Sequence, residues 1–405
     1  MRSGNASRGV TVVPTAVLAD PSRPPVAVKP VQRTDRRTLG FRAQNDLNGV
    51  ITASGRQLEL DGQPYNFVGV NAYELATDWG VNYGCGPMLT DAQLDAFFAS
   101  LRPNSLVRFW AFEGSMAINI QTGQIDWAPL DRVFAAASAY HQRLIVSLTD
   151  QGGACDGNEW YDPTWYLGGF RPPRVDVENP VGPATLMPLS YWDYMQAIVE
   201  RYRNAPALGM WEPISEAEAS TCPAQFEPTG CGGHQTCPDE AAAALALRYF
   251  FDVVGKEIHT LDPDHLVESG LLGSGQCGTQ GRDYEYVSAS PGIDVLSYHD
   301  YYPATQVMGG DQWNGLAVRL QQAAALNKPI IAGETGIVAG PAAGCLSLGQ
   351  RATDFANRIE AQLQAGSSGV LIWDWFPQQT SDCDLQTYPG DPLLTVLYNI
   401  DVNGV

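Results

Sequence analysis

Eight short apolar runs alternate along the chain with longer segments of helical periodicity, and this alternation is the strongest constraint on the fold. The apolar runs span residues 65–71, 105–112, 143–150, 207–214, 265–270, 293–299, 328–334 and 369–375. The helical segments between them span residues 90–101, 129–140, 190–202, 239–261, 312–326 and 348–365. Near-continuous apolar runs are typical of strands covered on both faces, and strand–helix alternation indicates a parallel sheet.

Eight such units over about 350 residues predict an α/β fold of the (β/α)₈ barrel type with long loops. The competing architecture is a doubly wound open sheet, which usually carries a Gly-rich phosphate-binding sequence after its first strand. Here the first strand ends in Val70-Asn71-Ala72-Tyr73, which has no such pattern. Before this strand, Gly49–Tyr65 holds two extended runs and the turn pair Asp61-Gly62, and we expect an N-terminal β-hairpin.

Charge narrows the choice of partners. The chain has 24 basic and 44 acidic side chains and a net charge of −20, which argues against nucleic acid and anionic membranes. No stretch approaches the roughly 20 apolar residues that span a bilayer. Residues 1–43 differ, with eight basic side chains against two acidic ones and five prolines. They predict a tail or linker, disordered or left from processing, ahead of one domain at residues 44–405.

The eight cysteines contain no C-x-x-C pair, which favours disulfides in an oxidising compartment over a zinc or redox site. We therefore expect disulfides and a secreted protein, and free thiols are the alternative to disulfides. We also expect the protein to be a monomer. All eight follow predicted strands, in the loops that build the C-terminal face of a barrel. Cys345 and Cys383 follow neighbouring strands and could bridge. Four others crowd the loops after the fourth and fifth strands: Cys222, Cys231, Cys237 and Cys277.

Polar and aromatic residues lie at the ends of the predicted strands, where a barrel carries its active site. They are Asn71, Arg108, Asp150, Glu216, His299, Glu334 and Trp373. Two carboxyl groups on separate strands suit retaining glycoside hydrolysis, in which one donates a proton and the other, about 5–5.5 Å away, attacks the sugar. Each residue alone also has a structural explanation, as a salt-bridge partner or a core side chain.

Several motifs in the order of the predicted strands resemble family 5 of the glycoside hydrolases, a family of retaining (β/α)₈ enzymes. Residues 49–376 are most similar to its fungal-type endo-β-1,4-mannanases. The motifs are Gly69-Val70-Asn71-Ala72-Tyr73, Val107-Arg108-Phe109-Trp110, Trp211-Glu212-Pro213-Ile214-Ser215-Glu216, His265-Leu266-Val267, Tyr298-His299-Asp300-Tyr301, Lys328-Pro329-Ile330-Ile331-Ala332-Gly333-Glu334 and Leu371-Ile372-Trp373.

The resemblance implies a polysaccharide substrate, no cofactor and no metal. It implies Glu216 as the acid/base and Glu334 as the nucleophile. The substrate-binding residues that it implies are Asn71, Tyr73, Arg108, Trp110, Ser215, His299, Tyr301 and Trp373. The sequence departs from the family at Ser215, where Asn is usual, and at Thr149-Asp150-Gln151, where a mannanase has Asn-Asn-Trp. β-1,4-Glucan is therefore the second substrate, and an inactive sugar-binding barrel is the rival function.

The nearby carboxylates allow other assignments. Glu212 lies within the fourth strand and Glu218 lies beyond the motif, so Glu216 is preferred. A metal site of His299, Asp300 and Glu334 is disfavoured because H-x-H and H-E-x-x-H spacings are absent from the sequence. The resemblance places Arg108 near Glu334, and a cation at about 4–6 Å lowers a carboxyl pKa. Glu216 must hold a proton, and we expect it to be buried among apolar neighbours.

Overall fold

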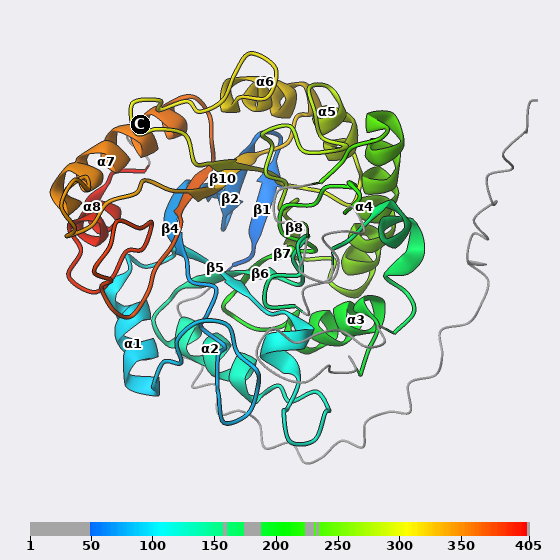
Figure 1. Ribbon diagram of the computed structural model, residues 1–405, viewed down its shortest axis with the longest axis horizontal. Helices are drawn as coiled ribbons and strands as arrows, with labels where there is room; N and C mark the ends of the chain where they lie inside the picture. Colours follow the sequence, from blue (N-terminus) through cyan, green and yellow to red (C-terminus); the bar gives the residue numbers. More distant parts are fainter. Residues whose placement is uncertain (1–48, 157–159, 174–187, 223–230, 232–234, 403–405) are drawn as a thin grey trace, which may run out of the picture. The chain divides into compact units, whose positions relative to one another are not determined.

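The structure, a computed structural model, describes residues 49–156, 160–173, 188–222, 231 and 235–402 (Figure 1). The basic segment predicted at residues 1–43 lies outside the described residues.

The predicted parallel barrel is confirmed. Its strands are β4 (Phe67–Asn71), β5 (Leu106–Trp110), β6 (Arg143–Ser147), β7 (Leu208–Glu212), β8 (Leu266–Val267), β9 (Leu296–Asp300), β10 (Ile330–Thr335) and β11 (Gly369–Ile372). They pair in chain order from β4 to β8 and from β9 to β11, and β11 pairs with β4. A single parallel bridge between Glu268 and Val295 joins β8 to β9 and completes the ring.

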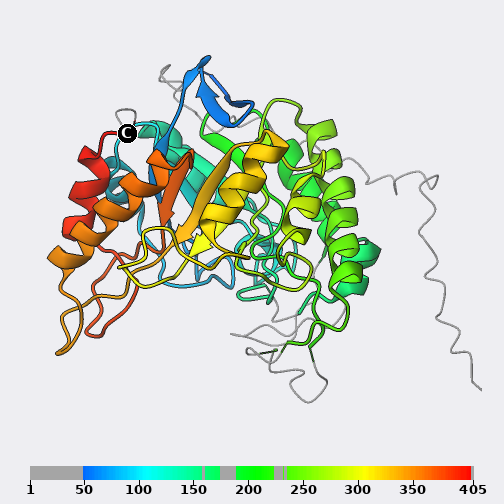
Figure 2. The same cartoon turned by 90° about the horizontal axis from the view of Figure 1, so that it is seen from above.

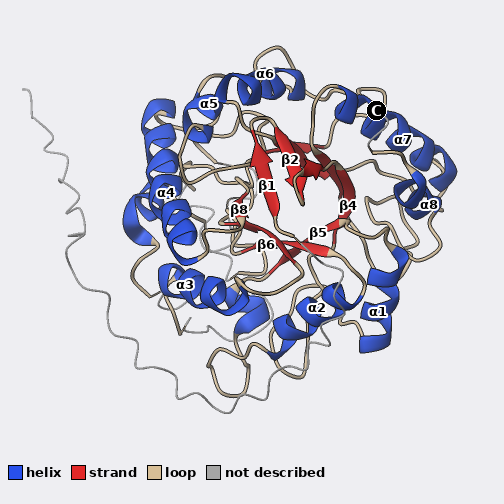
Figure 3. Cartoon of the chain, turned by 180° about the vertical axis from the view of Figure 1, so that it is seen from behind, coloured by secondary structure: helices blue, strands red, loops and turns tan. Residues whose placement is uncertain are grey.

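Helices surround the strands, as Figures 1 and 3 show. They are α1 (Asp91–Ser100), α2 (Ala128–Ala139), α3 (Tyr191–Tyr202), α4 (Glu240–Leu261), α5 (Asp283–Ser288), α6 (Leu316–Leu326), α7 (Leu348–Gln364) and α8 (Pro392–Asn399). Two short π-helices, η1 (Glu113–Ala117) and η2 (Trp165–Gly169), lie in the loops after β5 and β6. Side chains of Thr90, Ser190, Asp239 and Ser347 cap the helices that follow them, which explains why these boundaries agree with the sequence.

The predicted hairpin is also confirmed, and it closes the N-terminal end of the barrel. It consists of β1 (Ile51–Ser54) and β2 (Gln57–Leu60), with a two-residue third strand, β3 (Gln63–Pro64). Ile51 and Leu58 belong to one buried apolar cluster with residues on or directly beside the barrel strands, namely Phe67, Leu106, Ile145, Met210, Val295, Ile331 and Leu371. Figure 2 shows the hairpin at one end of the barrel and the long loops at the other.

Four disulfides connect the long loops: Cys85–Cys155, Cys222–Cys231, Cys237–Cys277 and Cys345–Cys383. The expected Cys345–Cys383 bridge is confirmed, and it joins the loops after β10 and β11. Cys85–Cys155 and Cys237–Cys277 likewise each join two loops. Within the described chain, none of the helices combines the length and apolar character needed to cross a membrane.

Candidate active site

Arg108 lies at the centre of a polar network at the C-terminal end of the barrel. It is 1% exposed, and its guanidinium group makes five hydrogen bonds. Nε and Nη2 donate to the two oxygens of Glu212, at 2.5 and 2.7 Å. Nη1 donates to Glu334 at 2.7 Å and to Asn71 at 2.9 Å, and Nη2 also donates to Ser215 at 2.9 Å. Burial opposes a charge here, but Glu212 and Glu334 keep the pKa of Arg108 well above its usual value.

Glu334 on β10 is held by three neighbouring groups. Arg108 donates to Oε1, and the Tyr301 hydroxyl donates to Oε2 at 2.5 Å. His299 Nδ1 lies 3.5 Å from the same Oε2. The carboxylate is therefore fixed in one orientation at the mouth of the barrel.

Glu216 reaches the same place from the loop after β7. Its φ is +54°, in the left-handed region, and its N–H donates to the carbonyl of Gly270 at 2.7 Å. Gly270 also has a positive φ, and a side chain there would meet the Ile214 carbonyl at 2.0 Å. This close turn directs Glu216 Oε1 to His299 Nδ1, 2.7 Å away. One ligand atom each from Glu216, His299 and Glu334 lie within 4.8 Å of one another.

Two expectations from the sequence are wrong, one about the pKa of Glu334 and one about the burial of Glu216. The pKa of Glu334 is raised, because burial outweighs the opposing charges of His299 and Arg108. The Glu216 side chain is 34% exposed, so it is not buried among apolar neighbours. Burial disfavours a charged imidazole, but Glu334 and Glu216 together raise the pKa of His299.

The other polar residues on and after β7 have partners different from those of Glu216. The Ser215 hydroxyl is buried and accepts a hydrogen bond from Arg108. Glu212 is buried beneath the site, and Ser147 donates to it at 2.8 Å. Glu218 accepts a hydrogen bond from Ser220 at 2.8 Å. The structure therefore brings Glu216, but not these two carboxylates, to the partly exposed position beside His299.

Three predicted aromatic residues form one cluster beside these carboxylates. Tyr73 stacks on Trp373, with ring centroids 5.6 Å apart, and lies 4.6 Å from Trp110. All three line a pocket of about 460 Å³, together with the Cys85–Cys155 bridge and Asp374. The buried indole N–H of Trp110 has no acceptor among the described residues. An apolar platform with a free donor is suited to a sugar ring.

Some carboxyl groups near the site were missed or underestimated from the sequence. Asp374 follows Trp373, and burial and the charge of Glu334 raise its pKa to about 7. Asp150 accepts hydrogen bonds from Gly152 and Ala154, but burial and the charge of Glu216 raise its pKa to about 7. Glu268, one residue beyond β8, is buried beside Glu212 and was missed, although its strand position carries the signal.

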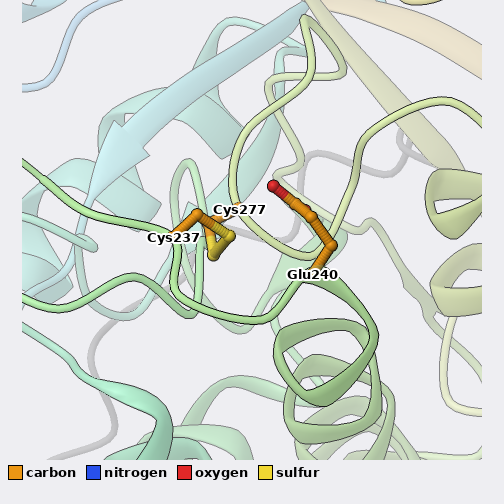
Figure 4. A group of neighbouring side chains, drawn as sticks. All are labelled: Cys237, Glu240 and Cys277. Carbon is orange, nitrogen blue, oxygen red and sulfur yellow. A yellow bond between two sulfur atoms is a disulfide. The ribbon is translucent and has the colours of Figure 1, made fainter.

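Among the described residues, two groups of side chains have spacings suited to a metal ion. The first, Glu216, His299 and Glu334, is the site itself. The second is Cys237, Glu240 and Cys277 (Figure 4). The two cysteines form a disulfide, so this group has no thiolate that could bind a metal ion. The Glu240 carboxylate already accepts hydrogen bonds from Gly278 and Gln280. Asp300 points elsewhere, to Gln362 and Arg358, and does not join His299 and Glu334.

The chain was compared with family models, curated proteins and solved structures. No family model matches. The probable mannan endo-1,4-β-mannosidase C of Aspergillus terreus is 26% identical over 291 residues, 62% of this chain and 64% of that protein. The probable mannan endo-1,4-β-mannosidase F of Aspergillus oryzae is 25% identical over 80% of this chain and 66% of that protein. The chain thus spans slightly less than two thirds of each relative.

Solved structures show the same fold. The endo-1,4-β-mannanase of Rhizomucor miehei superimposes with a TM-score of 0.58 at 17% identity, covering 86% of this chain and 97% of that one. The glycoside hydrolase family 5 mannosidase of the same organism gives a TM-score of 0.56 at 16% identity, with coverage of 87% and 97%. The chain therefore has the same barrel fold as these two structures, and the relatives that it matches by sequence are mannan endo-1,4-β-mannosidases.

Proposed function

We propose that this protein is a retaining endo-β-1,4-mannanase in which Glu334 is the nucleophile and Glu216 is the acid/base. The observation that carries the proposal is the spacing of these carboxylates. An oxygen of each lies within 4.8 Å of the other and of His299. Retaining glycosidases hold their carboxyl groups about 5–5.5 Å apart, whereas inverting enzymes need about 6.5–9.5 Å for a water molecule.

In the first step, Glu334 attacks the anomeric carbon while Glu216 gives its proton to the departing glycosidic oxygen. Arg108 and Tyr301 hold both oxygens of Glu334, so the nucleophile is positioned before the sugar arrives. The bond to the sugar then removes the negative charge of Glu334. In the second step, Glu216 takes a proton from water, the hydroxyl attacks the anomeric carbon, and Glu334 is released with net retention.

The proposed substrate is a mannan, because the curated relatives are mannan endo-1,4-β-mannosidases. Stacking of a sugar ring in the pocket of Tyr73, Trp110 and Trp373 is part of this proposal. We also propose that the protein acts as a secreted monomer without nucleic-acid or membrane partners. Its four disulfides and net charge of −20 support this part of the proposal.

The test is release of reducing ends from linear mannan, galactomannan, β-1,4-glucan and xylan, with product sizes read by chromatography and the anomer of the first product read by NMR. We expect mixed oligosaccharides from mannan with retained configuration. The Glu334→Ala variant is the control for contaminating activity. Binding to mannan without release of reducing ends would replace the enzyme by a sugar-binding barrel, and an inverted product would overturn the roles of the carboxylates.

The Ser215→Asn variant examines the departure from the family. Serine has no carboxamide, and the hydroxyl of Ser215 is buried and already accepts a hydrogen bond from Arg108. If mannan is the substrate, adding the carboxamide should change kcat on mannan, while the melting temperature stays close to that of the wild type. Activity that moves instead from mannan to glucan would indicate that Ser215 sets the choice of sugar.

A further inference from the structure

A second buried carboxyl group lies next to Glu212, one layer below the catalytic pair. The strands β7 and β8 are paired with Trp211 opposite Val267, so the following residues, Glu212 and Glu268, are neighbours across the sheet. The N–H of Glu268 donates to the Trp211 carbonyl at 2.8 Å, which continues this register. Both side chains are fully buried. The barrel therefore places two carboxyl groups side by side in its interior.

The hydrogen bonds of these two groups are unequal. Glu212 receives two from Arg108 and one from Ser147. Glu268 Oε1 accepts one from the N–H of Gly270 at 3.0 Å. Its buried Oε2 has no donor in hydrogen-bond geometry among the described residues, and its neighbours include the Glu212 carboxylate and the Ser297 hydroxyl. An anionic oxygen would have only the Ser297 hydroxyl as a possible donor here and would face the Glu212 carboxylate, whereas an O–H group would have an acceptor in Glu212.

We propose that Glu268 is a positioning residue that stays protonated in the folded protein and donates a hydrogen bond to Glu212. This proton leaves Arg108 facing two carboxylates, Glu212 and Glu334, and not three. The guanidinium group is then shared between the structural carboxylate below and the nucleophile above. The catalytic consequence rests on the proposed function, but the protonation of Glu268 does not.

The groups that face Glu268 support a neutral carboxyl. They are Glu212 on β7, Arg108 on β5, the Ser297 hydroxyl on β9 and Tyr284 on α5. Burial and the negative charge of Glu212 raise the pKa of Glu268 well above its usual value, and Arg108 opposes them less strongly. Two adjacent carboxyl groups that share one site ionise unequally for this reason.

Thermal unfolding tests the proton without any substrate. The folded protein keeps a proton that the unfolded chain releases above about pH 4.5, so this carboxyl should reduce stability as pH rises from there. Glu268→Gln replaces the O–H donor by an N–H donor and has no such proton. The variant should melt with the wild type at pH 4.5 and about 5 °C above it at pH 8. Glu360→Gln, on the exposed face of α7, should follow the wild type at every pH.

A constant gap between Glu268→Gln and the wild type across this pH range would overturn the protonation. The positioning role has its own readout, the acidic limb of kcat/KM against pH. Glu268→Leu removes the donor, draws Arg108 toward Glu212 and should move this limb upward by about half a pH unit, because Glu334 loses part of its cation. Glu268→Gln should restore the wild-type limb. If the acidic limb of kcat/KM lies at the same pH in both variants and in the wild type, the positioning role of Glu268 is overturned.

If the wild type cleaves no polysaccharide, the proposed function fails, while the melting comparison still decides the state of Glu268.

Discussion

The two ends of the barrel are built from the same eight strands but hold opposite kinds of interior. At the N-terminal end, Phe67, Leu106, Ile145 and Leu371 pack against the hairpin in a purely apolar cluster. At the C-terminal end, the interior is filled by Arg108 and the carboxylates that surround it, all buried. Only a few residues along each strand therefore separate the apolar cluster from the buried charged network.

The difference matters because buried charges stabilise a protein little. Removing charges from water costs several kcal/mol for each ion, and their attraction repays this only with good geometry. Apolar burial contributes about 25 cal/mol per Å² without such a cost. We therefore expect substitutions at the N-terminal end to change mainly stability, and substitutions of the two reacting carboxylates at the C-terminal end to change mainly turnover.

The largest expected effect is at Glu334. Glu334→Ala should reduce kcat on mannan on the order of 10⁵-fold, because it removes the proposed nucleophile. Its melting temperature should stay near that of the wild type, since Arg108 keeps its two bonds to Glu212. Added azide or formate should yield a product of inverted configuration. Residual activity above about one part in a hundred would exclude the proposed role.

Glu216→Ala should have the next largest effect. It should lower kcat on polysaccharide about 10²–10⁴-fold, the range of general acid–base catalysis. An activated aryl glycoside needs little protonation and should still react with Glu334, and azide should restore turnover with retention. The control is Glu218→Ala, two residues away, where the carboxylate accepts from Ser220. Equal losses in the two variants would remove the distinction between these residues.

At the opposite end, Leu371→Ala should lower the free energy of unfolding by about 2–5 kcal/mol, because it leaves a cavity in a packed apolar cluster. Turnover at a temperature where the variant is folded should be within about twofold of the wild type, since the substitution touches no reacting group. Urea unfolding gives the first quantity and initial rates give the second. A large fall in kcat would mean that the two ends are coupled.

The smallest effect concerns the pH profile. Burial raises the pKa of Glu334, so the ionised nucleophile is lost as pH falls through this raised value. Tyr301→Phe removes the hydroxyl donor, which stabilises the anion, and should move the acidic limb of kcat/KM upward by about half to one unit. Tyr301 is 42% exposed, so the melting temperature should change little. An unshifted limb would show that this hydrogen bond does not stabilise the anion.

Much of the barrel could be predicted from the sequence, because most of its strands are short, mainly apolar runs that alternate with longer helical segments. The helices α5 and α8 were missed: they have only six and eight residues, too few for a clear period. Capping by Asp391 and the adjacent Pro392 was a usable signal for α8. The two extra π-helices lie in loops where local periodicity says nothing.

For the site, the strand ends and the order of the motifs predicted which residues lie on one face of the barrel. They did not predict the pKa of Glu334 or the exposure of Glu216. The pKa of Glu334 depends on the balance between burial and four neighbours from other parts of the barrel, namely His299, Arg108, Glu216 and Tyr301. The exposure of Glu216 depends on a left-handed turn held by Gly270, about fifty residues further along the chain. Glu268 lies within the predicted strand at residues 265–270, but the sequence alone does not show which way its side chain points. Only the register with β7 shows that it faces the interior.

The ring of strands is not equally strong all the way round. β8 has two residues, and its junction with β9 consists of the Glu268–Val295 bridge and a few backbone hydrogen bonds, among them Ser269 N–H to the Val295 carbonyl at 3.0 Å. Local opening of a protein begins where such bonds are few. This junction is therefore the place where solvent deuterium should first reach the inside of the barrel. The fold thus keeps its least protected seam beside the residues that hold its buried proton.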